Sequence, residues 1–305
     1  MRFLLAAFAI CVAVGAVLFW AYGGMDQLTI WAAEGQRKFQ NAMARALRGI
    51  RAGDTQALAT LLIVCFSYGF FHAVGPGHGK VLIGGYGVGR RVGLFKLSSI
   101  ALMSSLAQAV TAIILVYAGV FVLNWSRKQM VDITEKLMAP ISYAAIALIG
   151  LWLLWRGLRT FRRQMKAKQT SDGHDHNHDP ADGTCSGCGH RHAPSADEIA
   201  QLHSWRDTLI LISGIAIRPC SGALFLLVLT WRMGIELAGI LGALAMGLGT
   251  GSVTVAVAIA SVLFRDSALK SAGTSQRLAL LVPVLEITAG SLVVIIALQL
   301  LRSAL

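Results

Sequence analysis

Seven apolar runs, each long enough to cross a lipid bilayer, constrain this chain more than any other feature. A helix needs about 20 apolar residues to span the hydrocarbon core. Hydropathy places such runs at roughly 3–22, 57–83, 97–123, 139–159, 207–230, 236–264 and 280–301. Only 14% of the residues are charged, whereas an ordinary soluble domain has about 25%. The sequence therefore predicts an all-α, polytopic membrane protein with six or seven transmembrane helices.

The charged residues lie mostly between these runs, and they predict the orientation of the chain. The formal net charge of +12 would suggest nucleic acid as a partner of a soluble protein. Here the basic side chains flank the spans, where they set topology instead. With a cytoplasmic N-terminus, most of them lie on the side of the long hydrophilic segment 161–206. We predict that this loop is cytoplasmic, that membrane lipid surrounds the helices and that no nucleic acid binds.

The first 56 residues divide into two segments. Residues 1–23 are either a retained transmembrane anchor or a signal-like span. Cleavage would leave six spans and the same loop orientation. Residues 24–56 contain basic residues and an apolar helical face formed by Phe39, Met43, Leu47 and Ile50. This pattern predicts an external amphipathic helix that lies on the outer membrane surface.

The loop separates two comparable groups of three spans, residues 57–160 and 207–305. The first span of each group is interrupted, by Gly75-Pro76-Gly77 in one and by the segment from Pro219 to Gly222 in the other. The third spans begin near two prolines, Pro140 and Pro283. Broken helices at corresponding positions indicate a transporter's binding site. Because three spans reverse the direction of entry, we expect a 3+3 inverted repeat.

His72 and His78 flank the first break and are the leading candidates for metal ligands in the membrane. An imidazole in an apolar span is costly unless it faces a cavity, a partner or a ligand. Pro76 removes a backbone hydrogen bond and the adjacent glycines allow a bend, so both rings could turn inward, with Lys80 nearby. Imidazole suits nickel, cobalt, zinc and copper. The alternative is that neighbouring helices satisfy both histidines. A nucleotide-binding loop is excluded, because the segment before Lys80 lacks the first glycine and Val81 replaces the required hydroxyl.

The hydrophilic loop holds a second set of candidate ligands. They comprise a Cys-x-x-Cys pair and five histidines, namely His174, His176, His178, Cys185, Cys188, His190 and His192. Cysteine and histidine at this spacing are typical of a metal site, and the flanking residues predict no stable fold without metal. The loop is therefore expected to bind nickel, cobalt or zinc. A charged linker without a ligand is the alternative.

Arg218 and Cys220 lie in the second break. An arginine at this depth needs a polar partner or water, and Glu286 in the last span is the carboxylate expected to supply it. Cys220 is either a small core residue or a thiolate ligand. Gln108, Thr250 and Thr254 are expected to form hydrogen bonds between helices.

Together, the His-x-x-Gly-Pro-Gly-His-Gly-Lys stretch, the histidine-bearing loop and the Pro-Cys segment resemble the nickel/cobalt efflux permeases, over roughly residues 57–302. The family motif is similar to His-Gly-x-Glu-Pro-Gly-His-Ser-Lys and corresponds to His72, Pro76, Gly77, His78 and Lys80. Gly75 replaces the family's glutamate, which removes an oxygen ligand, and the Cys pair replaces some of the family's loop histidines. The resemblance implies secondary, outward transport of nickel or cobalt across a bacterial inner membrane.

Two other functions are considered. A binding site does not encode direction, so an uptake permease is one alternative. The Pro-Cys-Ser segment is also similar to membrane thiol–disulfide carriers of cytochrome biogenesis, which need two facing cysteines such as Cys65 and Cys220. Such a carrier would leave His72 and His78 without a role. No catalytic triad or nucleotide motif indicates an enzyme, and no permanently bound cofactor is expected.

Overall fold

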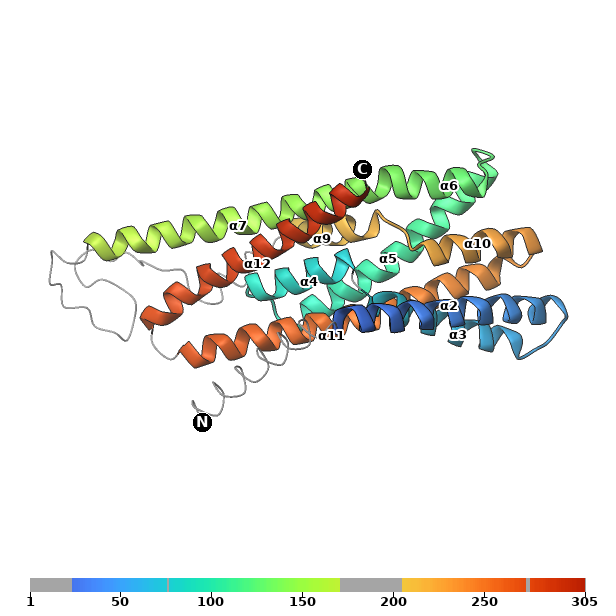
Figure 1. Cartoon of the computed structure of the whole chain (residues 1–305), viewed down its shortest axis with the longest axis horizontal. Helices are drawn as coiled ribbons and strands as arrows, with labels where there is room; N and C mark the ends of the chain where they lie inside the picture. The colour runs from blue at the N-terminus through green and yellow to red at the C-terminus, as the bar shows by residue number, and fades with distance from the viewer. Residues whose placement is uncertain (1–23, 76, 171–204, 273–274, 305) are drawn as a thin grey trace.

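The computed structural model describes residues 24–75, 77–170, 205–272 and 275–304. Within these ranges it consists of helices without strands. The helices are α2 (Gly24–Arg51), α3 (Ala57–Val74), α4 (His78–Gly89), α5 (Leu94–Phe121), α6 (Arg127–Ile133), the π-helical turn η1 (Thr134–Met138), α7 (Ala139–Thr170), α9 (Trp205–Ala216), α10 (Ser221–Met233), α11 (Glu236–Ala272) and α12 (Ser275–Ala304). They form one elongated bundle in which α7 and α11 cover much of the long axis (Figure 1).

Six of the seven predicted spans have a counterpart among the described helices. Five helices are long and apolar enough to cross a membrane, and α9 with α10 forms a sixth candidate bent by 62°. These helices turn large apolar side chains outward, among them Ile63, Ile114, Leu148 and Leu292, which are all more than half exposed. Lipid can cover such side chains, whereas water would leave extensive apolar patches. The predicted all-α membrane fold is confirmed. The proposed span at 3–22 lies outside the described residues.

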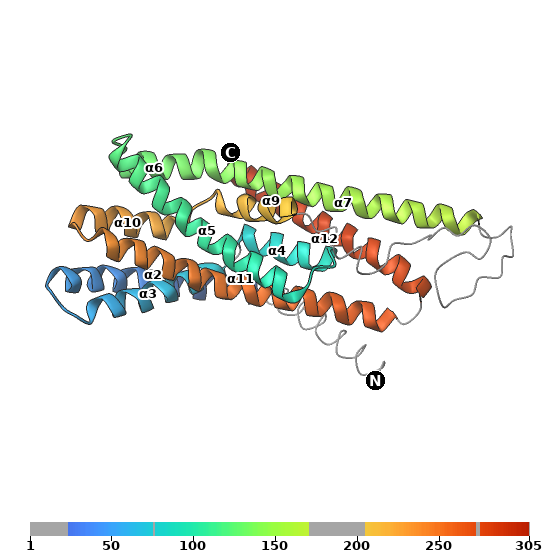
Figure 2. The same ribbon diagram turned by 180° about the vertical axis from the view of Figure 1, so that it is seen from behind.

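The prediction for the amphipathic helix was right about its existence and wrong about what it covers. Helix α2 runs beside α3 in both views (Figures 1 and 2) rather than lying across the end of the bundle. Met43 and Leu47 are 1% exposed and pack in one apolar cluster with Leu61 and Tyr68 of α3. An apolar helical face can be buried by protein as well as by lipid, and here the protein's own α3 covers it.

The two predicted halves pack against each other reciprocally. Helix α3 of the first half packs on α11 of the second, and α9 of the second half packs on α5 of the first. The third helices, α7 and α12, form the most extensive helix pair in the described part of the chain. In each contact, the first span of one half packs on the second span of the other half. An inverted repeat requires this correspondence. The repeat itself stays a prediction.

One predicted boundary agrees with the structure and one differs. The last span begins at Leu281, near Pro283 as predicted, although α12 itself begins earlier, at Ser275, and so contains Pro283. A proline is tolerated within a membrane helix because neighbouring groups satisfy the freed carbonyl. The hydrophilic segment predicted from residue 161 starts as helix, since α7 continues to Thr170. Polar residues after residue 160 lower the hydropathy, which ends the predicted span, but they do not interrupt the helix.

Close contact between α3 and α11 depends on two glycines. A Cβ atom added to Gly249 would lie 2.0 Å from the carbonyl oxygen of Phe66, and one added to Gly69 would lie 2.1 Å from that of Met246. Small residues allow membrane helices to approach at the backbone, where van der Waals contact stabilises the pair. This crossing holds the first half against the second immediately beside the helix breaks.

We expect Gly249→Ala to destabilise the folded protein, because a backbone carbonyl cannot move aside as a side-chain end can. Overpacking of this kind costs about 1–3 kcal/mol. Gly214→Ala in α9 is the matched control, since its Cβ would meet only Ile149 at 3.7 Å. Thermal unfolding of the two purified variants in detergent measures the difference. Equal unfolding temperatures for both variants would contradict this account of the crossing.

Candidate functional site

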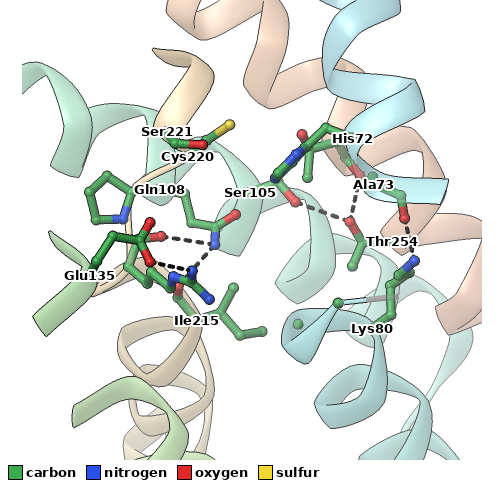
Figure 3. Close-up of a pocket in the computed structure, with 15 residues that line it drawn as sticks. His72, Ala73, Lys80, Ser105, Gln108, Glu135, Ile215, Cys220, Ser221 and Thr254 are labelled. Atoms are coloured by element: carbon green, nitrogen blue, oxygen red, sulfur yellow. Dashed lines mark hydrogen bonds and ion pairs between the residues drawn. The ribbon is translucent and has the colours of Figure 1, made fainter. Parts of the chain in front are cut away.

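The two helix breaks meet at a cavity of about 260 Å³ near the middle of the bundle. Residues around the break between α3 and α4 form one side and residues around the break between α9 and α10 form another, while α5, α11 and η1 complete the wall (Figure 3). The residues that line it are His72, Ala73, Gly77, Gly79, Lys80, Ser105, Gln108, Glu135, Ile215, Arg218, Pro219, Cys220, Ser221, Thr250 and Thr254. The structure therefore brings together four of the predicted pathway residues, namely His72, Lys80, Arg218 and Cys220.

Side chains from the protein cap the carbonyl ends of both broken helices. The Lys80 ammonium donates to the carbonyl oxygens of Ala73 and Gly75 and, at 3.1 Å, to that of Val74. The Gln108 amide donates to the carbonyl of Ile215 at 3.1 Å and to that of Arg218 at 3.2 Å. The last carbonyls of a helix lack partners within it, so these two side chains stabilise the breaks in a nonpolar surrounding.

Hydroxyl groups join the second spans of the two halves beside the cavity. Ser105 of α5 and Thr254 of α11 share a hydrogen bond of 3.1 Å. Thr250 donates to the carbonyl of Gly69 at 3.3 Å, which links α11 to α3. The expectation that Gln108, Thr250 and Thr254 bond between helices is confirmed.

His72 is held in place by an aromatic neighbour and shares the cavity with a thiol. Its ring stacks on Tyr68, with 6.1 Å between ring centroids and an interplanar angle of 6°. The Tyr68 hydroxyl in turn accepts a hydrogen bond of 3.0 Å from Gln36 on α2. The imidazole and the Cys220 thiol both line the same cavity (Figure 3). One nitrogen donor and one sulfur donor, contributed by the two different breaks, thus lie together in the cavity.

The predicted partner of Arg218 was wrong. Its guanidinium lies 3.2 Å from the Glu135 carboxylate and donates to the Tyr143 hydroxyl. Glu286 instead lies 3.6 Å from Arg156 of α7 and does not line the cavity. The depth of Glu286 in the last span suggested the pairing, but its rotation about α12 directs it toward α7. Glu286 therefore has no contact with this site.

Several predicted residues cannot be placed at the cavity. His78 begins α4 beside it, but its side chain and Pro76 lie outside what the structure describes. The same holds for the predicted loop ligands Cys185, Cys188, His174, His176, His178, His190 and His192. Among the described residues, no group of three histidine, cysteine or carboxylate side chains forms a metal site. Cys65 is fully buried in the apolar cluster formed with α2, away from the cavity lining.

Sequence reasoning missed four residues of this site: Glu135, Tyr143, Tyr68 and Met246. Glu135 lies in η1, and single π-helical turns are frequent at functional sites. The sequence does place the carboxylate of Glu135 about one helical turn before an apolar run, and this position could have indicated a role at the site. Tyr68 and Met246 resemble ordinary core residues in the sequence, and only their contacts with His72 and Cys220 distinguish them.

The fold and the site define a class: a polytopic helical membrane protein with a polar cavity where two broken helices meet, as in secondary transporters. A family profile described as "High-affinity nickel-transport protein" matches residues 58–186. A Haemophilus influenzae protein named "Putative nickel/cobalt efflux system" is 32% identical over 223 residues, which cover 70% of this chain and 69% of that protein. No solved structure gives a significant match. The chain belongs to the nickel/cobalt transport family.

Proposed function

We propose that this protein is a secondary transporter that exports nickel or cobalt across the inner membrane of a bacterium. The observation that carries the proposal is the cavity that His72 and Cys220 both line between two broken helices. Imidazole and thiolate suit borderline and soft metal ions. Polar side chains among apolar membrane helices are costly, and binding a metal ion accounts for both of them. The name of the Haemophilus relative supports the outward direction.

The proposed pathway runs along the long axis of the bundle. The histidine- and cysteine-bearing loop follows α7, whose end lies opposite the turn between α2 and α3 (Figure 1). We assign that loop to the cytoplasm, where it collects metal as an accessory site. His78 is proposed as a further ligand at the start of α4. Lys80 and Arg218 line the proposed pathway. Carbonyl groups accept hydrogen bonds from Lys80, and Glu135 pairs with Arg218.

Tyr68 lines a second cavity of about 240 Å³, and its ring stacks on His72 of the central cavity. The second cavity lies between α2, α6 and α10, and Ser221 lines both. A Cβ atom at Gly222 would be 2.3 Å from the Tyr68 ring, so the ring fills the space against α10. We propose that movement of Tyr68 away from Gly222 connects the two cavities and releases metal on the side of α2.

Accumulation of radioactive nickel and cobalt tests both the function and its direction. Cells that lack the protein should accumulate more of one metal and grow poorly in its excess, and the intact gene should reverse both effects. A variant without residues 174–192 should export less efficiently but still export, because these residues lie outside the predicted spans. Lower accumulation in the absence of the protein would favour uptake. Unchanged contents of both metals would reject the proposal.

A further inference from the structure

A soft thioether donor lies beside the imidazole and the thiol that the pathway already uses. The thioether sulfur of Met246 is 4.0 Å from the Cys220 sulfur. Met246 is 1% exposed and is located on α11 one helical turn before Thr250, which lines the cavity. The three side chains come from three separate elements: His72 from α3, Cys220 from the start of α10 and Met246 from α11.

The sulfur–sulfur distance fits two ligands of one metal ion. A metal–thiolate bond measures about 2.3 Å. Two such bonds at a tetrahedral or trigonal angle place their sulfur atoms about 3.8–4.0 Å apart. The observed separation therefore needs no movement of α10 toward α11 to accommodate an ion between the sulfurs.

The imidazole is already oriented by its surroundings. Stacking on Tyr68 fixes the plane of the His72 ring, and Gln36 holds the tyrosine hydroxyl at 3.0 Å. Groups behind a ligand that fix its orientation are a regular part of metal sites. His72 and Cys220 line the same cavity, and the Met246 sulfur lies 4.0 Å from that of Cys220, so one nitrogen and two sulfur donors lie in one region.

We propose that His72, Cys220 and Met246 form a nitrogen–sulfur–sulfur site that binds soft monovalent cations of the cuprous type, which compete there with nickel. This inference rests on the proposed function, since it uses the same cavity. Thiolate and thioether ligands select cuprous ion over hard cations. Charge favours the same choice, because the described lining carries two fixed cations, Lys80 and Arg218, and one carboxylate, Glu135. A monovalent ion with one thiolate is neutral and adds no net charge to this buried space.

Silver ion is the probe, because it is soft and monovalent and needs no reductant. Binding is measured by equilibrium dialysis on the full chain in detergent, with Cys11, Cys185 and Cys188 replaced by Ser in every sample. Met246→Leu conserves volume and removes the sulfur, and we expect it to weaken silver binding about tenfold or more. Met130→Leu is the matched control, since Met130 is equally buried at 1% and lies in the same apolar cluster.

Equal silver affinity in Met246→Leu and the parent protein would overturn the inference, as would equal weakening by Met130→Leu. Silver should also inhibit nickel transport into proteoliposomes, and Met246→Leu should relieve that inhibition more than Met130→Leu. Persistent inhibition in Met246→Leu would count against the site. Dialysis does not depend on transport, so a protein that binds silver through Met246 but moves no nickel would reject the proposed function alone.

Discussion

Replacement of His72 by Ala should abolish nickel and cobalt transport while leaving the protein in the membrane. His72 is the described histidine that lines the cavity, and its loss would leave only sulfur donors beside Cys220. Changes even behind a metal ligand reduce affinity about 10–100-fold, so loss of the ligand itself should have at least that effect. The measurement is metal content in cells that express equal amounts of protein, judged from membrane fractions.

A neighbouring substitution on the same helix controls for this result. Ser67 lies on the exposed side of α3, where its hydroxyl donates to the carbonyl of Ile63 within the same helix at 2.9 Å. Ser67→Ala should transport normally. If His72→Ala also transports normally at the same protein level, the cavity is not the pathway and the proposed ligands are wrong.

Gly222→Ala should impair transport strongly because it displaces the Tyr68 ring that stacks on His72. The added methyl would lie 2.3 Å from the Tyr68 ring, and the ring cannot remain stacked on His72 if it moves. Disturbing such an orienting group should reduce metal affinity about 10–100-fold. Nickel binding to the purified variant and nickel export from cells measure the two consequences separately.

Gly79→Ala is the matched control, since it lines the same cavity and its Cβ would meet Ile215 at an ordinary 3.4 Å. It should be nearly silent. The double variant Gly222→Ala, Tyr68→Ala should be no worse than Tyr68→Ala alone, because contacting residues are not additive. Equal loss from Gly222→Ala and Gly79→Ala would show that the Tyr68 ring does not position His72 for metal.

Six of the spans and the two helix breaks could be predicted because both depend on local sequence. Each span requires its own run of apolar residues, and a break requires glycine or proline at that point. The two interrupted spans were therefore recognisable at Gly75-Pro76-Gly77 and at Pro219. The structure brings the two breaks together at one cavity, as corresponding broken helices should be.

Partners of side chains could not be predicted, because they depend on the rotation of one helix against another. Depth in the membrane suggested Glu286 for Arg218, but packing directs Glu286 toward α7 and places Glu135 beside the arginine instead. The apolar face of α2 illustrates the same limit, since hydrophobicity does not distinguish a lipid surface from the side of α3. Met246 was missed because a thioether at an apolar position is usually a packing residue.

The cap that Lys80 forms on α3 has a mechanical consequence. Lys80 belongs to α4, yet its ammonium holds the last carbonyls of α3. These hydrogen bonds connect α3 to α4 across the break. Bending at Gly77 would therefore first have to break the hydrogen bonds between the Lys80 ammonium and three carbonyl oxygens. The break is therefore expected to be rigid rather than to act as a hinge. If the cavity opens, α3 and α4 should move together as one rigid body relative to the helices of the other half.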